Sequence, residues 1–161
     1  MASTWRPKPN DWVLNNDILD KAVTAIQRDC KIDTAHDIPY VAGYSKNGRT
    51  LYVDRTLPRS FTQSDGKKVD VMRYLLLHEA VEKALLDSYD IPYQFAHQIA
   101  LRVERDAVKA DGADWGEYNA FFTKHIKRIH NRDKFDNVPR DLDLTPYHDE
   151  EDHATIERMD A

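Results

Sequence analysis

The sequence predicts an α+β domain in which a helix comes first, a short β-hairpin or small sheet second, and a helical block last. Two patterns carry this prediction. Apolar residues recur at helical spacing before residue 30 and again after residue 69, whereas the stretch between them holds two short β-like runs around a turn. The length of 161 residues is typical of one domain, and 41% hydrophobic residues suffice to bury a core.

The chain divides into three regions by composition. Residues 1–14 carry prolines and polar residues and predict an extended N-terminal arm, and residues 15–135 form a single domain. Residues 136–161 are acidic, interrupted by proline and without apolar periodicity. They predict a C-terminal tail that is either draped over the domain or partly disordered.

The first elements are a helix and a hairpin. A helix is expected from about Asn16 to Arg28, because its apolar residues share one face. Asn47-Gly48 is a strong hairpin signal, since both residues tolerate positive φ. The alternating residues 51–54 predict a half-buried strand after this turn, and the polar residues 58–68 predict a loop.

Three helices make up the predicted helical block. The first runs from about Val69 to Ser88, and the second from about Pro92 to Ala110, with Gly112 suited to end it. The third is expected from Asp114 to about Asn131, and Glu117 completes a capping box with Asp114.

The overall composition argues against several classes of protein. The formal net charge of −5 and the pI of about 5.8 give no basic field, so nucleic acid is not favoured as a partner. No apolar run approaches the roughly 20 residues that span a bilayer, and the N-terminus lacks the apolar core of a signal peptide. With Cys30 as its one cysteine, the chain is expected to be cytoplasmic, without a membrane partner.

The stretch "YLLLHEAVEKALLD" contains the pattern His-Glu-x-x-Glu. His78 and Glu82 are four residues apart and lie on one helix face, where both side chains can hold one metal ion. Glu79 is turned by about 100° around the helix axis, from where it can reach a water on that metal without being a ligand.

A third ligand is expected on the following helix. His97 comes 97 − 78 = 19 positions after His78, and the short break between the helices favours antiparallel or steeply crossed packing. Ala96 and Ala100 flank His97 and permit close approach. Glu104 lies on the same side and can accept the second imidazole N–H of a ligating histidine.

This arrangement resembles the zincin metallopeptidases, and most closely their gluzincin group. There a His-Glu-x-x-His helix is followed, one helix later, by a glutamate ligand. In this chain the two residue types are exchanged, so that Glu82 stands at the second histidine and His97 at the glutamate. A hairpin with an edge strand beside the substrate cleft precedes the metal helix in the family, and "RTLYVDR" occupies that place.

The resemblance implies a zinc-dependent hydrolase that acts on a peptide or protein substrate. His78, Glu82 and His97 would bind Zn²⁺, and Glu79 would act as the general base. Zincins often add a tyrosine or histidine that stabilises the oxyanion; Tyr118 is taken for this role, and the other candidates are His125, His130, Tyr44 and Tyr52.

Two alternatives to an active enzyme stay open. One is a catalytically inactive zincin-like scaffold that binds metal and serves as a protein-interaction module, of a phage or mobile-element type. The other is a metal-free helical protein that binds a partner through its third helix or its tail. In that case the polar residues are a hydrogen-bonded cluster, and Glu82 and Lys83 could equally lie at the surface. The sequence does not predict the oligomeric state.

Overall fold

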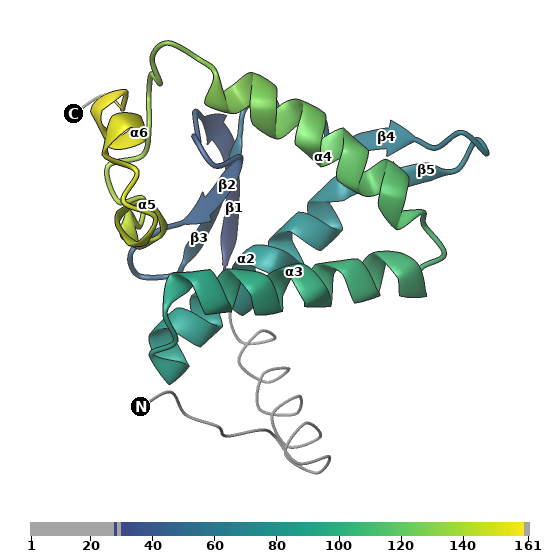
Figure 1. Cartoon of the computed structure of the whole chain (residues 1–161), viewed down its shortest axis with the longest axis horizontal. Coiled ribbons are helices and arrows are strands. Elements are labelled where there is room, and N and C mark those ends of the chain that lie inside the picture. The colour runs from purple at the N-terminus through teal and green to yellow at the C-terminus, as the bar shows by residue number, and fades with distance from the viewer. Residues whose placement is uncertain (1–27, 29, 160–161) are drawn as a thin grey trace.

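The computed structural model describes residue 28 and residues 30–159, which have the predicted α+β architecture (Figure 1). The arm over 1–14 and nearly all of the helix predicted over 16–28 lie outside the described residues. The strands are β1 (Lys31–His36), β2 (Ala42–Tyr44), β3 (Thr50–Asp54), β4 (Ser60–Thr62) and β5 (Lys68–Asp70). The helices are α2 (Val71–Tyr89), α3 (Tyr93–Ala110), α4 (Trp115–His130), α5 (Thr145–Asp149) and α6 (His153–Glu157).

The larger sheet has the strand order β1-β3-β2. β1 runs parallel to β3, whereas β2 runs antiparallel to it, so the predicted hairpin is present as β2 and β3. Gly48 closes their turn with a φ of 70°, and its N–H donates to the Ser45 carbonyl at 2.9 Å. Glycine adopts this left-handed conformation without steric cost. β2 is left at an edge of the sheet, next to α2.

β3 is buried on both faces, so the prediction of a half-buried strand is wrong. Residues 51–54 are each at most 6% exposed. Val53 packs into the core with residues of α2, while Tyr52 packs against Leu142 and Tyr147 near the C-terminus. The alternating pattern did not predict this burial for two reasons. β1, which was not predicted, makes β3 a central strand, and the C-terminal residues Leu142 and Tyr147 cover its second face.

Residues 58–68 contribute to a second hairpin and do not form the polar loop that the sequence predicts. β4 pairs antiparallel with β5, with Phe61 opposite Val69, and Gly66 turns the chain with a φ of 88°. The ring of Phe61 stacks on that of Phe121 in α4, with centroids 4.9 Å apart. Packing against a helix that is distant in sequence therefore stabilises strands whose own sequence is mostly polar.

α2 and α3 form an antiparallel pair, and each differs from its predicted bounds by at most two residues. α2 begins after Asp70, whose carboxylate accepts from the Met72 N–H, and ends at Asp90 in the left-handed conformation with φ 51°. Pro92 then precedes the first turn of α3. The contact between the two helices contains small side chains, which allow the backbones to approach. These are Ala80, Ala96 and Ala100, all 0% exposed.

α4 begins after Asp114, as predicted, and the Asp114 carboxylate accepts from the Glu117 N–H at 2.9 Å. In place of the reciprocal bond of a capping box, the Glu117 carboxylate accepts from the Ser64 N–H of the second hairpin at 2.9 Å. The Asp114 N–H donates instead to the Gln63 side chain at 2.7 Å. The helix start is thus bound to the β4–β5 hairpin.

The C-terminal segment, residues 136–159, packs against the larger sheet (Figure 1). Leu142 and Tyr147 are each 2% exposed. The Asp143 N–H donates to the Tyr44 carbonyl at 2.8 Å, which covers part of the outer edge of β2. The segment therefore adds to the core.

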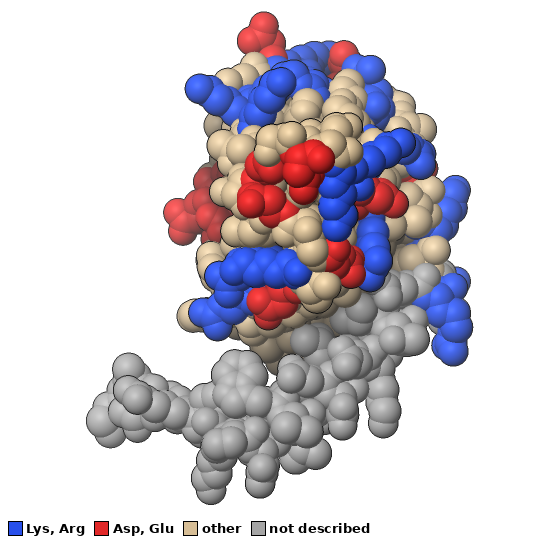
Figure 2. Space-filling view, turned by 90° about the vertical axis from the view of Figure 1, so that its right-hand side faces the viewer, with Lys and Arg blue, Asp and Glu red and all other residues tan. Residues whose placement is uncertain are grey.

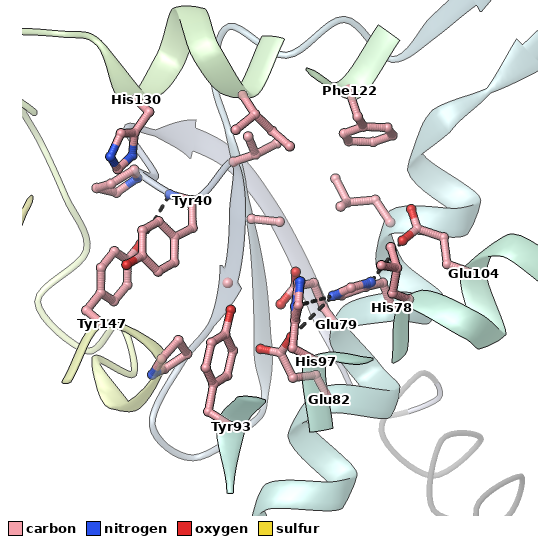
Figure 3. A pocket seen from close by; sticks show the side chains of 18 of the residues that line it. Tyr40, His78, Glu79, Glu82, Tyr93, His97, Glu104, Phe122, His130 and Tyr147 are labelled. Atoms are coloured by element: carbon pink, nitrogen blue, oxygen red, sulfur yellow. Dashed lines mark hydrogen bonds and ion pairs between the residues drawn. The ribbon is translucent and has the colours of Figure 1, made fainter. Parts of the chain in front are cut away.

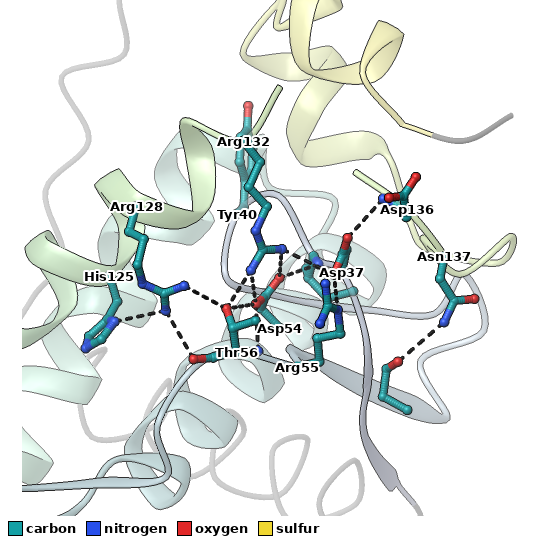
Figure 4. Close-up of polar contacts among 12 residues, drawn as sticks. Asp37, Tyr40, Asp54, Arg55, Thr56, His125, Arg128, Arg132, Asp136 and Asn137 are labelled. Atoms are coloured by element: carbon teal, nitrogen blue, oxygen red, sulfur yellow. Dashed lines mark hydrogen bonds and ion pairs between the residues drawn. The ribbon is translucent and has the colours of Figure 1, made fainter. Parts of the chain in front are cut away.

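A buried ion-pair network joins the end of α4 to the end of β3 (Figure 4). Arg132 donates to Asp54 from both terminal guanidinium nitrogens, at 2.9 and 3.0 Å, and its Nη1 also lies 3.2 Å from Asp37 Oδ1. Burial by itself would raise the pKa of Asp54. Hydrogen bonds from Arg132 and Thr56 and from the backbone outweigh burial and hold the pKa below its ordinary value. The ionised carboxylate is therefore part of the folded structure.

The face in Figure 2 carries charges of both signs. Lysine and arginine side chains are interspersed with aspartate and glutamate, and neither sign forms a large patch of its own. No helix in the described part of the chain is both long and apolar enough to cross a membrane.

We expect Asp54→Asn to lower the free energy of unfolding by about 2–3 kcal/mol at pH 7, because Arg132 loses its charged acceptor. The carboxylate stabilises the fold above its unfolded-state pKa of about 3.9, and this contribution is lost as the pH falls through the lower folded-state pKa. Urea unfolding at pH 7 and at pH 3 measures the free energy of unfolding of Asp54→Asn and of the unsubstituted chain. The difference between the two chains should be smaller at pH 3 than at pH 7.

The matched control is Asp106→Asn, at a side chain that is 75% exposed. It should change the free energy of unfolding by less than about 0.5 kcal/mol. An Asp54→Asn effect of equal size at both pH values would contradict the role assigned to the ionised carboxylate.

Candidate metal centre

α2 and α3 bring His78, Glu82 and His97 together in one cluster (Figure 3). His78 Nε2 lies 3.2 Å from Glu82 Oε2 and 3.2 Å from His97 Nδ1. His97 Nδ1 lies 3.1 Å from Glu82 Oε2. The three atoms form a nearly equilateral triangle, to which the four-residue spacing on α2 and the antiparallel helix contact both contribute.

The triangle has nearly the size of one face of a zinc coordination tetrahedron. Zinc binds imidazole nitrogen and carboxylate oxygen at about 2.0–2.2 Å, so neighbouring ligand atoms lie roughly 3.3–3.5 Å apart. The observed separations of 3.1–3.2 Å would need to widen by only a few tenths of an ångström. The same separations also suit hydrogen bonds, so the distances alone do not distinguish a metal site from a hydrogen-bonded cluster.

The hydrogen atoms at the cluster are compatible with either a proton or a metal ion in the triangle. His78 Nδ1 lies 2.9 Å from Glu104 Oε1, and because a carboxylate only accepts, Nδ1 carries the hydrogen. In a neutral imidazole, Nε2 then directs a lone pair at another acceptor, Glu82 Oε2. A proton on Nε2 removes this conflict, because Nε2 then donates to Glu82 Oε2, whereas a metal ion would contact all three atoms at once.

Two tyrosines hold the carboxylates in place. Tyr118 in α4 donates its hydroxyl hydrogen to Glu104 Oε2 at 2.5 Å, while the other oxygen of Glu104 faces His78. Tyr44 in β2 donates to Glu82 Oε1 at 2.8 Å, which leaves Oε2 facing the triangle. Partners of this kind orient metal ligands and set which imidazole nitrogen is free.

Glu79 has a different environment from the other two glutamates. It lines the same cavity and is 6% exposed, yet no described residue forms a hydrogen bond with its carboxylate. Every fully buried side-chain polar atom of the described residues has a partner, so the Glu79 oxygens are open to the cavity. Burial, together with the charges of Glu82 and Glu104, raises the pKa of Glu79 well above its ordinary value, against the opposing charge of His78.

The ligand candidates carry opposite pKa shifts. Burial alone would raise the pKa of Glu82, but hydrogen bonds from His78 and His97 outweigh it and hold the pKa at about 2. Burial alone would lower the pKa of His78, but hydrogen bonds to Glu104 and Glu82 and the charge of Glu79 raise it well above the ordinary value. These shifts describe an ionised Glu82 carboxylate beside a His78 imidazole that favours its protonated form.

The cluster lines a cavity of about 300 Å³. α3 and α4 provide apolar walls that include Leu101 and Phe122, and the C-terminal segment contributes Pro146 and Tyr147. The His97 side chain, which belongs to the cluster and lines the cavity, is 38% exposed, so solvent reaches the cluster at His97. A small molecule or part of a peptide can therefore reach the cluster.

The structure gives the predicted oxyanion candidates other contacts. Tyr118 lines the cavity, but its hydroxyl donates to Glu104. Tyr44 similarly donates to Glu82. Tyr52 and His125 do not line the cavity. His130 lines it, but away from the cluster and beside Tyr40.

Two residues at or beside the site, Tyr93 and Lys83, are not among those that the sequence predicts. Tyr93 lines the cavity one helical turn before His97, with ring centroids 5.5 Å apart, and this four-residue spacing is the signal that could have revealed it. Lys83 is 2% exposed, and its ammonium group donates to Asp143 at 3.0 Å. Its local partner Asp87, four residues on at 3.1 Å, is typical of an exposed helix face. The burial of Lys83 comes from contacts with the remote Lys46 carbonyl and Asp143.

Comparison of the chain with protein-family models, with curated proteins and with solved structures finds no match. The interpretation of the cluster therefore depends on its own geometry and chemistry.

We expect Glu79→Gln to raise the free energy of unfolding of the metal-free chain by about 1–2 kcal/mol at pH 7. The change removes a buried acid beside Glu82 and Glu104 and keeps the size of the side chain. Urea unfolding in the presence of a chelator measures the difference. The exposed control Glu150→Gln should change stability by less than about 0.5 kcal/mol. A destabilised Glu79→Gln chain would mean that the carboxylate is held by favourable contacts.

Proposed function

We propose that the chain is a zinc-dependent hydrolase that cleaves peptide bonds, with His78, Glu82 and His97 as ligands and Glu79 as general base. One observation carries the proposal. Three donor atoms lie within 3.1–3.2 Å of one another, beside a buried carboxylate that no described residue engages by a hydrogen bond. The resemblance of the His-Glu-x-x-Glu helix to zincin metallopeptidases supports the same class of reaction.

The donor set fits zinc better than the other common divalent ions. Two imidazole nitrogens and one carboxylate oxygen are the ligand types of a catalytic zinc, which keeps a fourth position open. Magnesium and calcium would require more oxygen ligands than the cluster offers. Zinc with two neutral histidines and one glutamate has a formal charge of 2 − 1 = +1, which offsets the charge of the nearby Glu79.

The chain's own residues then have distinct roles. When bound, zinc polarises an acyl oxygen and makes a nearby water more acidic. Glu79 accepts a proton from the attacking water and delivers it to the amine as the carbon–nitrogen bond breaks. Glu104 accepts the hydrogen of His78 Nδ1, so Nε2 is the nitrogen that would bind zinc, and Tyr44 would keep one oxygen of Glu82 directed at the ligand position.

We expect the full chain, purified without a histidine tag, to bind roughly one zinc ion with N₂O ligation. His97→Ala should weaken zinc binding by more than the roughly 10–100-fold that loss of an outer partner costs. Isothermal titration and elemental analysis measure affinity and content, and removal of the metal by a chelator should lower the melting temperature.

The matched control for this experiment is His148→Ala, since His148 is exposed at the end of α5. It should bind zinc as the unsubstituted chain does. Equal zinc affinity of the His97→Ala and His148→Ala chains would contradict the assigned ligand set. Absence of any zinc uptake by the unsubstituted chain would favour a metal-free protein that binds a partner.

We expect Glu79→Gln to lower peptide hydrolysis by about 10²–10⁴-fold while zinc content stays the same, because the variant cannot accept the proton. Casein and a mixture of quenched fluorescent peptides serve as substrates, and Glu150→Gln is the control. Retained hydrolysis in Glu79→Gln would exclude Glu79 as the base. A zinc-loaded unsubstituted chain that cleaves none of these substrates would favour the inactive scaffold.

A further inference from the structure

The hydroxyl groups around the cavity differ in what they contact. Four tyrosines line it: Tyr40, Tyr93, Tyr118 and Tyr147. Tyr40 donates to Asp152 at 2.7 Å, and Tyr118 donates to Glu104 at 2.5 Å. The hydroxyl of Tyr147 accepts from the Tyr40 N–H at 3.3 Å. Among these four, Tyr93 has the one hydroxyl without a hydrogen bond to a described residue.

That hydroxyl is open to the interior of the cavity. Tyr93 is 7% exposed overall, so its ring is buried. Every fully buried side-chain polar atom in the described part of the chain has a hydrogen-bond partner. The unpartnered oxygen of Tyr93 therefore keeps some accessible surface, and the cavity that the residue lines provides it. At neutral pH a phenol carries its hydrogen and can donate it to a bound molecule.

The backbone of Tyr93 is fixed next to the metal-ligand candidates. It is the first residue of α3, one turn before His97, and the two rings lie 5.5 Å apart at 36°. The Tyr93 N–H donates to the Asp149 carboxylate at 3.2 Å, so the C-terminal segment holds this helix start. In Figure 3 the Tyr93 ring extends into the cavity on the same side as His97 and Glu82.

We propose that the Tyr93 hydroxyl binds the acyl oxygen of a peptide substrate and donates to it as that oxygen gains negative charge. The role rests on the proposed hydrolase function and deepens it, because it identifies a group of the chain that contacts the reacting carbonyl. It also replaces the role expected for Tyr118, whose hydroxyl hydrogen is already used by Glu104. A preorganised donor of this kind acts without reorganisation as the charge develops.

The test compares Tyr93→Phe with Tyr89→Phe in the full chain. Tyr89 lies at the end of α2, is 40% exposed and does not line the cavity, so its variant removes a hydroxyl elsewhere. Zinc affinity is measured first by isothermal titration. Binding of acetohydroxamate to the zinc-loaded chains follows, since its carbonyl imitates the acyl oxygen. Peptide hydrolysis gives kcat and KM separately.

We expect the unsubstituted chain, Tyr93→Phe and Tyr89→Phe to bind zinc equally and to melt at the same temperature, because the Tyr93 hydroxyl forms no hydrogen bond with a described residue. Tyr93→Phe should bind acetohydroxamate about 3–10-fold more weakly than the other two chains, as loss of one hydrogen bond predicts. Its kcat should fall about 100-fold or more, with a smaller change in KM.

Zinc uptake with equal acetohydroxamate affinity and equal kcat in both variants would overturn the role of Tyr93 and leave the hydrolase proposal intact. An unsubstituted chain that binds zinc but not acetohydroxamate would also overturn it, because the acyl oxygen would then have no access. Failure of the unsubstituted chain to bind zinc would overturn the proposed function itself, and the role of Tyr93 with it.

Discussion

Burial of three glutamates in one small cavity is the constraint on which the arrangement of this protein depends. Glu79, Glu82 and Glu104 are each at most 6% exposed, and buried carboxylates are costly unless they are hydrogen-bonded or neutralised. The larger sheet supplies Tyr44 to one of them, and α4 supplies Tyr118 to another. Sheet and helices are thus joined through their contacts with the same few acids, and the polar cluster is part of what positions these elements.

The antiparallel contact of α2 and α3 brings these groups into register. His78 meets Glu104 while Glu82 meets His97, so partners on the two helices run in opposite sequence directions. Alanines at the contact allow this approach, because a larger side chain there would separate the helices and pull the imidazole away from the carboxylate. The left-handed Asp90 and the following Ile91 and Pro92 reverse the chain within a few residues. Packing of small apolar residues therefore determines the geometry of the ionic cluster.

The parts of this structure that follow from local sequence were predictable, and the parts that follow from remote contacts were not. Helical periodicity placed α2, α3 and α4 within two residues of their bounds, and spacing alone put His78 and Glu82 on one face. By contrast, β1 becomes a strand by pairing with β3, and the second hairpin is stabilised against α4. The Tyr44–Glu82 bond spans 38 positions, and no window of sequence contains the information that would predict it.

The difference between Glu79 and its two neighbours is the strongest reason to regard the cluster as functional and not only structural. A cluster that served stability alone would satisfy each buried acid, as Tyr44 and Tyr118 do for Glu82 and Glu104. Glu79 is instead left without a hydrogen bond to any described residue, in a cavity that it shares with the 38% exposed side chain of His97. The unpartnered hydroxyl of Tyr93 lies in the same cavity. One acceptor and one donor held unsatisfied beside three convergent nitrogen and oxygen atoms cost stability, and a bound molecule that used both would offset that cost.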